Sequence, residues 1–240
     1  MVSPDRRAFT EAKALRFDLK LGAECLDPFE VASALGVHVV AIPLGDDSPV
    51  EGVYLRRSGR GFILVNSSKA YRRQRFTCAH EIGHHRLLGD ADEYDLVEGP
   101  EAISGQGSTD PDERDAQLFA AEFLMPEVGV RPMIKQGMTL EDMVASVVLG
   151  YDVSLQSAAI RLSELSIIGD AETKAFLSAM KEGWQSFYRS HGINSNDGGR
   201  RGQTRLPNAF RQLANALREA DVLSPERFAE LVKRDLPSVK

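Results

Sequence analysis

The sequence predicts a mainly helical α+β protein with one small antiparallel sheet of three strands. Two observations lead to this fold class. Apolar residues recur at helical spacing over most of the 240 residues. One stretch, residues 37–66, instead carries short β-branched or aromatic runs separated by turn residues. We expect the sheet to pack on a central helix within residues 1–126, followed by a helix-turn-helix-like pair (127–169) and a helical C-terminal extension (170–240) with a flexible loop near 191–206.

The first part of the chain predicts two helices and then three strands. Residues 5–21 carry apolar positions among charges. In "DPFEVASALG", Asp27 suits an N-cap, Pro28 the first helical position and Gly36 the end. The helical spacing of apolar residues then ends, and the expected strands are the runs "VHVVAIPL", "EGVYLR" and "GFILVN".

The rest of the chain reads as helices joined by polar segments. Residues 71–88 and 110–125 predict helices, the second stopped by Pro126, and the acidic, aperiodic residues 90–109 between them predict a loop. The runs "TLEDMVASVVLG" and "SLQSAAIRLSEL" predict a pair joined by "YDV". We further expect a helix over 171–189, the loop "HGINSNDGGRRGQTRLP" and two short helices to the end.

Composition and charge narrow the function classes. The net charge is -6, and residues 171–240 carry 12 Lys/Arg against 8 Asp/Glu, so the body is acidic and the tail mildly basic. A surface devoted to nucleic acid is therefore not expected. The two cysteines, Cys25 and Cys78, form no CxxC pair. With no signal-like N-terminus and no apolar run near ~18 residues, we expect a cytoplasmic protein without a membrane span.

The stretch "RFTCAHEIGHHRLLGD" holds three of the five histidines of the chain. His80, Glu81 and His84 form HExxH, and on a helix positions i and i+4 lie on one face, so both imidazoles reach one metal ion. Glu81 lies about 100° from His80 around the helix. That position suits a general base acting on water that the metal activates. Gly83 leaves room for another segment to pack closely.

A catalytic zinc usually takes three protein ligands, so a third must come from another element. The acidic loop 90–109 would position a ligand poorly. On the next helix, Glu113 and Glu122 are the rivals. Glu113 also fits a helix cap, because Asp110, Pro111 and Glu113 match an N-cap, a first-turn proline and a capping-box carboxylate. The pattern alone leaves capping and metal binding about equal.

Two motifs together resemble the ImmA/IrrE family of metallopeptidases. The family pattern is approximately RFTxAHExGH, followed on the next helix by ExxAxxFAxxxLMP. The chain carries "RFTCAHEIGHH" and "ERDAQLFAAEFLMP", and the resemblance covers roughly residues 27–165. The matching positions are Arg75, Phe76, Thr77, Ala79, His80, Glu81, Gly83, His84, Glu113, Ala116, Phe119, Ala120, Leu124, Met125 and Pro126.

The resemblance implies a zincin-like domain in residues 1–126, with Zn²⁺ held by His80, His84 and Glu113 and with Glu81 as the base. This is a gluzincin-like set, with Glu as third ligand. It also implies a protein substrate, a helix-turn-helix transcriptional repressor, whose cleavage relieves repression, often in stress responses. The sequence departs from the pattern at Cys78 and His85. We interpret Cys78 as a core residue and His85 as a packing or surface residue.

Two alternatives follow from the same residues. One is a non-proteolytic, metal-containing partner of a repressor or of a toxin–antitoxin system, although a purely structural metal has no need of Glu81. The other is a peptide deformylase, faintly suggested by "AECLD" around Cys25, but the glycine expected before that cysteine is Glu24.

The last two features concern DNA. The second helix of the helix-turn-helix-like pair carries a single arginine, Arg161, and a DNA-reading helix normally carries more basic and amide side chains. We therefore favour packing or substrate docking over DNA binding for this pair. Arg200, Arg201 and Arg205 lie in the Gly-rich loop, which we interpret as a solvated linker rather than a contact for a partner or nucleic acid.

Overall fold

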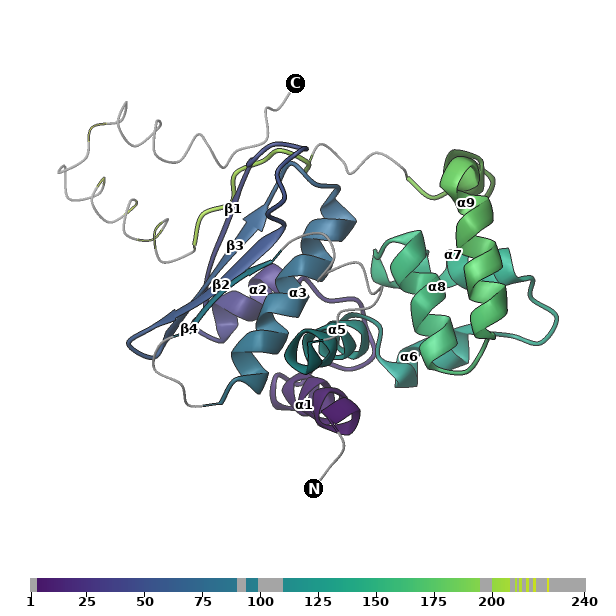
Figure 1. The fold of residues 1–240 in the computed structure, drawn as a ribbon, viewed down its shortest axis with the longest axis horizontal. Helices are drawn as coiled ribbons and strands as arrows, with labels where there is room; N and C mark the ends of the chain where they lie inside the picture. The colour runs from purple at the N-terminus through teal and green to yellow at the C-terminus, as the bar shows by residue number, and fades with distance from the viewer. Residues whose placement is uncertain are drawn as a thin grey trace.

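The computed structural model describes residues 4–89, 94–98, 110–194 and 200–207, with isolated positions 210, 212, 215, 218 and 224. It confirms a mainly helical α+β fold. One face of a small sheet packs against two helices, two more lie beside them, and a second group of helices follows (Figure 1). The helices next to the sheet are α2 (Pro28–Ala34), α3 (Tyr71–Leu87), α1 (Pro4–Asp18) and α5 (Pro111–Leu124).

The sheet differs from the three antiparallel strands expected. It has four strands in the order β1-β3-β2-β4, and β1 runs parallel to β3. The strands are β1 (His38–Ile42), β2 (Gly52–Arg57), β3 (Arg60–Asn66) and β4 (Tyr94–Glu98).

The hairpin between β2 and β3 explains the mixed topology. Its two-residue turn, Ser58 and Gly59, has φ of 49° and 74°, the positive values of a tight hairpin turn. β3 therefore pairs antiparallel with β2 and separates it from β1, which becomes an edge strand. The predicted loop 90–109 contains β4, which pairs with β2; the remainder of that loop lies outside the described residues.

Helical boundaries follow the capping residues predicted from the sequence. The Asp27 side chain accepts a hydrogen bond from the Phe29 N–H at the start of α2, and Asp110 accepts one from Asp112 at the start of α5. One helix was not predicted. Pro126 does end α5, but it also stands as N-cap of α6 (Glu127–Met133), because the fixed φ of proline suits a helix start as well as a stop.

The second helical group holds the expected pair. It consists of α6, α7 (Leu140–Tyr151), α8 (Leu155–Glu164) and α9 (Asp170–Ser190). Within the described ranges no single helix is long and apolar enough to cross a membrane. Helices α7 and α8 reach the required length and apolar composition only when they are taken together, and the angle of the bend between them is 110°. Both contribute buried side chains such as Val147 and Leu162 to the core.

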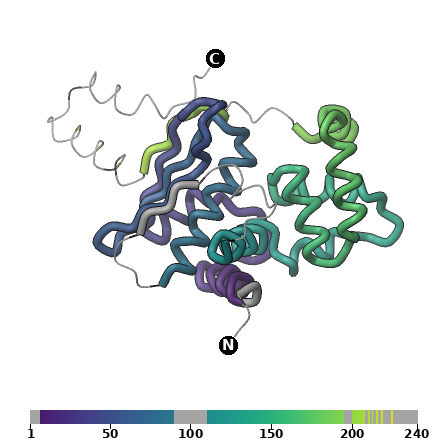
Figure 2. Tube along the Cα trace, viewed as in Figure 1, coloured from purple at the N-terminus to yellow at the C-terminus, as the bar shows by residue number. Residues whose placement is uncertain are grey.

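The chain then returns to the sheet. After α9, residues 200–207 run along the β1 edge of the sheet (Figure 2). Ala41 and Arg205 form an antiparallel bridge there. Residues 200–206 of the predicted flexible loop near 191–206 thus lie along the sheet, where the arginines find partners that the local sequence does not show. The two short helices expected after it lie in a part of the chain that is largely not described.

Candidate metal centre

Close packing of α3 on α5 positions the site. A Cβ at Gly83 would lie 3.1 Å from the Phe119 ring and 3.2 Å from the backbone of Ala116, so the missing side chain lets the two helices approach. This is the close approach that the sequence predicted for Gly83. The contact brings the first turn of α5 against the middle of α3.

Three ligand atoms converge at this contact. His80 Nε2 and His84 Nε2 are 3.0 Å apart, and the Glu113 carboxylate lies 3.3 Å from the first and 3.4 Å from the second. All three residues are buried, Glu113 to 8 % exposure. Among the described residues, these three form the one group of His, Cys, Asp or Glu whose ligand atoms all lie within 4.8 Å of one another.

These separations fit a tetrahedral ion. Two ligand atoms at about 2.0–2.1 Å from Zn²⁺ lie about 3.3 Å apart in tetrahedral geometry. Two imidazoles and one carboxylate are also a donor set that holds catalytic zinc. The residues present therefore fit the metal that the sequence predicts.

Glu81 lies on the sheet side of α3 and is fully buried. A Cβ at Gly52 in β2 would lie 2.0 Å from Glu81 Oε1 and 2.6 Å from Thr77 Cγ2. Gly52 therefore provides the space that the Glu81 carboxylate occupies. The sequence placed Glu81 beside the metal but gave no sign of Gly52, because the contact joins segments that are distant along the chain.

Beside Glu81, Tyr54 of β2 contacts His85. Tyr54 Oη and His85 Nδ1 are 2.8 Å apart. Burial raises the pKa of Tyr54, the Arg56 charge acts in the opposite direction, and the Glu81 charge also raises this pKa. Burial, with Arg56 and Arg86, lowers the pKa of His85. His85 is therefore a packed, hydrogen-bonded residue, in line with the packing interpretation, and the pair adjoins the base rather than the ligands.

Glu122, the rival third ligand, is engaged elsewhere. Its carboxylate forms a buried ion pair with Arg161 of α8, and Lys13 lies 3.9 Å away. Burial raises the Glu122 pKa, although Arg161 and Lys13 act in the opposite direction. The pair also explains Arg161: its guanidinium is fully buried inside the protein and points to no DNA surface.

Neither cysteine belongs to the ligand group. Cys78 is fully buried, and burial raises the pKa of its thiol well above the ordinary value, as expected for a small core residue. Cys25 Sγ instead lies 3.4 Å from Arg75 Nη2. The deformylase alternative has no support in this arrangement.

Comparison with known proteins decides the family. The model of the IrrE N-terminal-like domain, a peptidase family, matches residues 32–163, more than half of the chain. The chain belongs to this family. It is 37 % identical over 102 residues to the radiation response metalloprotease IrrE of Deinococcus radiodurans. The aligned residues make up 42 % of this chain and 30 % of that protein. Much of IrrE thus has no counterpart in the match.

A second relative comes from a bacteriophage. The chain is 28 % identical over 142 residues to an uncharacterized immunity region protein of Bacillus phage phi105, covering 59 % of this chain and 85 % of that protein. The family and the named metalloprotease support a metallopeptidase, and the buried His-His-Glu group of this chain suggests a metal.

Proposed function

We propose that the protein is a zinc-dependent endopeptidase, with Zn²⁺ held by His80, His84 and Glu113. The convergence of these three buried ligand atoms carries the proposal. Membership of a peptidase family supports the reaction class. Three protein ligands are the number that catalytic zinc sites use, whereas structural zinc sites use four.

Glu81 is the general base in this proposal. When bound, zinc supplies an acidified water and polarises the peptide carbonyl. Glu81 accepts the proton of the attacking water and passes it to the leaving amine. Gly52 leaves the space for this carboxylate, and Tyr54 lies near its charge. A larger side chain at position 52 would take the space that the Glu81 carboxylate needs.

The proposed substrate is a helix-turn-helix transcriptional repressor whose cleavage relieves repression. The resemblance to the ImmA/IrrE family supports this class, as does the acidic character of residues 1–170, since DNA-binding proteins present basic surfaces. The names of the two relatives, a radiation response metalloprotease and a phage immunity region protein, are compatible with a regulatory role.

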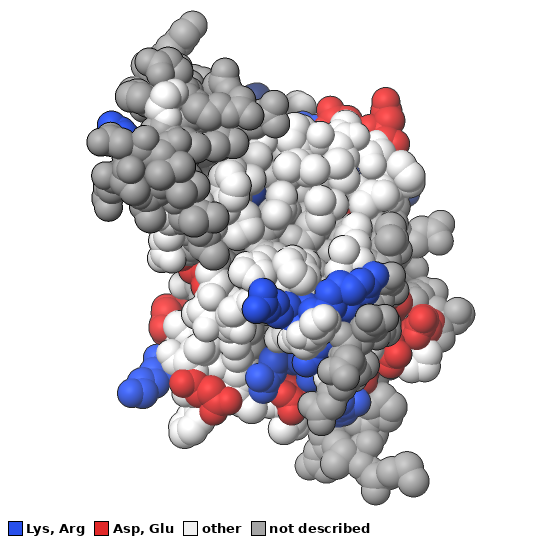
Figure 3. All heavy atoms as spheres, turned by 90° about the vertical axis from the view of Figure 1, so that its left-hand side faces the viewer, with Lys and Arg blue, Asp and Glu red and all other residues white. Residues whose placement is uncertain are grey.

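DNA binding by this chain receives less support. The arginine of α8 is buried, and on the face shown in Figure 3 the basic side chains form one central group, with others lying apart from it, among acidic side chains and a wide uncharged area. A duplex would require a longer basic stripe. We therefore assign α7 and α8 to packing and substrate docking.

The test uses a helix-turn-helix repressor encoded in the same locus. It is incubated with zinc-loaded protein and with Glu81→Gln, and fragments are identified by mass spectrometry. We expect cleavage by the wild type and a rate lower by about 10²–10⁴-fold in Glu81→Gln, the usual contribution of a general base. Cleavage by Glu81→Gln at the wild-type rate would refute the mechanism. Stable binding of an intact repressor would favour the non-proteolytic partner instead.

A further inference from the structure

A short segment at the β1 edge, Arg200–Leu206, is called the strap here. Its backbone pairs with the edge strand: Ala41 N–H donates to the Arg205 carbonyl at 2.9 Å, and Arg205 N–H donates to the Ala41 carbonyl at 2.8 Å. Gly202 N–H donates to the Ser67 carbonyl. An edge strand offers such unpaired backbone groups to any extended segment, so these bonds do not depend on the strap sequence.

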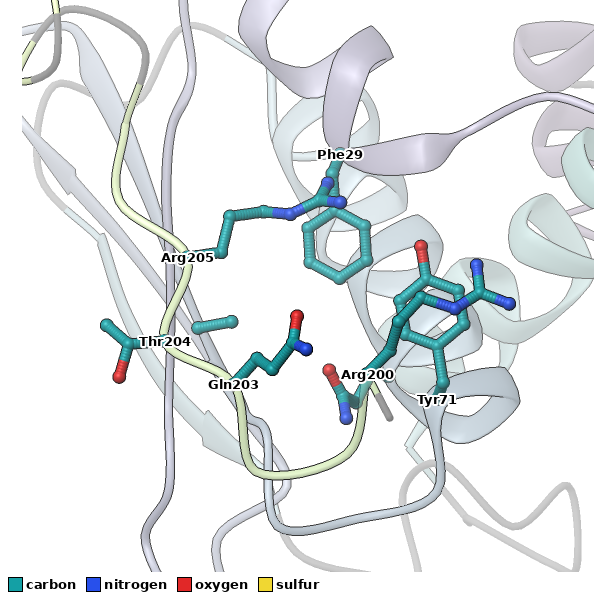
Figure 4. Close-up of a pocket in the computed structure, with 8 residues that line it drawn as sticks. Phe29, Tyr71, Arg200, Gln203, Thr204 and Arg205 are labelled. Atoms are coloured by element: carbon teal, nitrogen blue, oxygen red, sulfur yellow. The ribbon is translucent and has the colours of Figure 1, made fainter. Parts of the chain in front are cut away.

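The side chains add a specific pattern. The Arg200 guanidinium lies 3.7 Å from the centre of the Tyr71 ring, and that of Arg205 lies 4.2 Å from the centre of the Phe29 ring (Figure 4). The planar guanidinium group stacks on aromatic faces in a way that an ammonium does not. Two aromatic platforms thus receive the two arginines.

Each strap arginine also faces a carboxylate of another element. Arg200 is 3.6 Å from Asp152, Arg205 is 3.5 Å from Asp27, and Arg201 is 2.6 Å from Asp46. The three carboxylates come from different parts of the chain and meet only in the fold. We call the surface formed by Ala41, Phe29, Tyr71, Asp27, Asp46 and Asp152 the arginine groove.

The strap rests on this groove without becoming part of the core. Its three arginines remain 46 %, 54 % and 37 % exposed. A cavity of about 160 Å³ remains between strap and groove, lined also by Gln74 and Gln203. Exposed ion pairs and partly filled contacts are individually weak, so the strap can leave the groove while the domain stays folded.

We propose that the arginine groove is a docking site for an extended, arginine-containing segment of a protein partner, and that the strap occupies it within the same chain. In the groove, the Tyr71 and Phe29 rings stack with two arginines, and Asp46 forms an ion pair with a third. Ala41 forms the backbone hydrogen bonds. A partner segment docks by replacing the strap. That this partner is the peptidase substrate rests on the proposed function; docking itself does not.

The location suits such a role. Tyr71 is the first residue of α3, the helix that carries His80 nine positions later, about 14 Å along the helix axis. A segment held at the groove therefore lies within a few residues' reach of the metal ligands along the same helix. Docking there raises the local concentration of the partner near the cleavage site.

The test is a peptide-binding measurement on the full chain with EDTA present. The probe is a fluorescein-labelled peptide with the sequence of residues 198–208, followed by fluorescence anisotropy. The strap variant is Arg200→Ala with Arg201→Ala and Arg205→Ala. The matched control carries the same charge change on the exposed side of α9: Lys174→Ala, Lys181→Ala and Arg189→Ala.

We expect the strap variant to bind the peptide at least about tenfold more tightly than the wild type, because an attached strap competes at an effective concentration on the order of millimolar. The α9 control should behave as the wild type. Asp27→Asn or Asp152→Asn in the strap variant should weaken binding about threefold or more. A peptide with lysine in place of all three arginines should also bind more weakly.

Three results would overturn the inference. They are equal binding by the wild type and the strap variant, no binding by a strap variant whose circular dichroism is unchanged, and unfolding of the strap variant, which would make the strap a permanent part of the fold. Repressor cleavage without peptide docking would leave the proposed peptidase intact and remove only the groove. Peptide docking without repressor cleavage would leave the groove intact and remove the proposed peptidase.

Discussion

Glu113 stands in the first turn of α5, where a carboxylate commonly caps a helix. The structure separates the two roles that the sequence left open. The Asp110 side chain accepts the hydrogen bond from Asp112 at the helix start, and the Glu113 carboxylate lies beside His80 and His84. A cap and a metal ligand share the same local pattern. The two roles are distinguished by the position of α3 beside Glu113, and residue spacing within α5 does not specify that position.

Gly52 is a second residue whose role depends on a distant neighbour. We predict that Gly52→Ala lowers peptide cleavage by about 10²-fold or more, the lower limit for loss of a general base. The reason is steric, because the added Cβ would lie 2.0 Å from Glu81 Oε1 and displace the carboxylate. Cleavage rate and zinc content are measured together, and zinc should be retained.

The control for Gly52→Ala is Val53→Ala, next along β2 and half-buried. It should leave cleavage near the wild-type rate, because adjacent strand residues point to opposite faces of the sheet. An active Gly52→Ala enzyme would show that Glu81 is not confined by β2.

At the scale of elements, the site is the contact between α3 and α5. His80 and His84 come from one helix and Glu113 from the other, so the distance between the helices sets the ligand geometry. We predict that Gly83→Val destabilises the protein by about 1–3 kcal/mol, the usual cost of overpacking a core. It should also weaken zinc binding, because the Ala116 backbone must move away and carry Glu113 with it.

Chemical denaturation and a competitive zinc chelator measure these two effects. The matched control is Gly183→Val in α9, where a new Cβ would meet only the flexible end of Met180 at 3.7 Å. It should leave zinc affinity unchanged and should not lower stability through helix propensity, because valine is a better helix former than glycine. If both variants bound zinc equally well, the close approach at Gly83 would not matter for the site.

The elements also show what the sequence can and cannot predict. The bounds of α5 followed from the Asp110 cap, Pro111 and Pro126, whereas α3 followed from its apolar residues without a side-chain cap, and the HExxH pair followed from its motif. The order of strands did not, because parallel pairing of β1 with β3 is a non-local choice. β4 was missed within an acidic stretch, since its pairing with β2 outweighs weak local strand propensity.

At the scale of the whole molecule, one buried ion pair joins the two groups of helices. Arg161 of α8 pairs with Glu122 of α5 and donates to the Met125 carbonyl at 3.0 Å. The sequence offered Glu122 as a rival ligand, and it placed Arg161 on a helix for which packing or substrate docking was favoured over DNA binding. The structure uses both as internal partners. Neither assignment was accessible from spacing, because the two residues are 39 positions apart.

We predict that Arg161→Met lowers the free energy of unfolding by about 3–5 kcal/mol, because it leaves the Glu122 carboxylate buried without its main partner. Urea denaturation followed by circular dichroism measures the change. Arg189→Met on the exposed side of α9 is the control and should change stability by less than about 0.5 kcal/mol. A loss below 1 kcal/mol in Arg161→Met would mean that the pair does not hold the two helical groups together.

The most direct measurement of the central claim is the zinc content of dialysed protein, by inductively coupled plasma mass spectrometry. We predict about one zinc per chain for the wild type, for Glu81→Gln and for Asp112→Asn, an exposed carboxylate beside Glu113. Glu113→Gln should retain less than about a tenth of that amount, because it removes one of three protein ligands. Full zinc content in Glu113→Gln, or its loss in Glu81→Gln, would contradict the assignment of ligand and base.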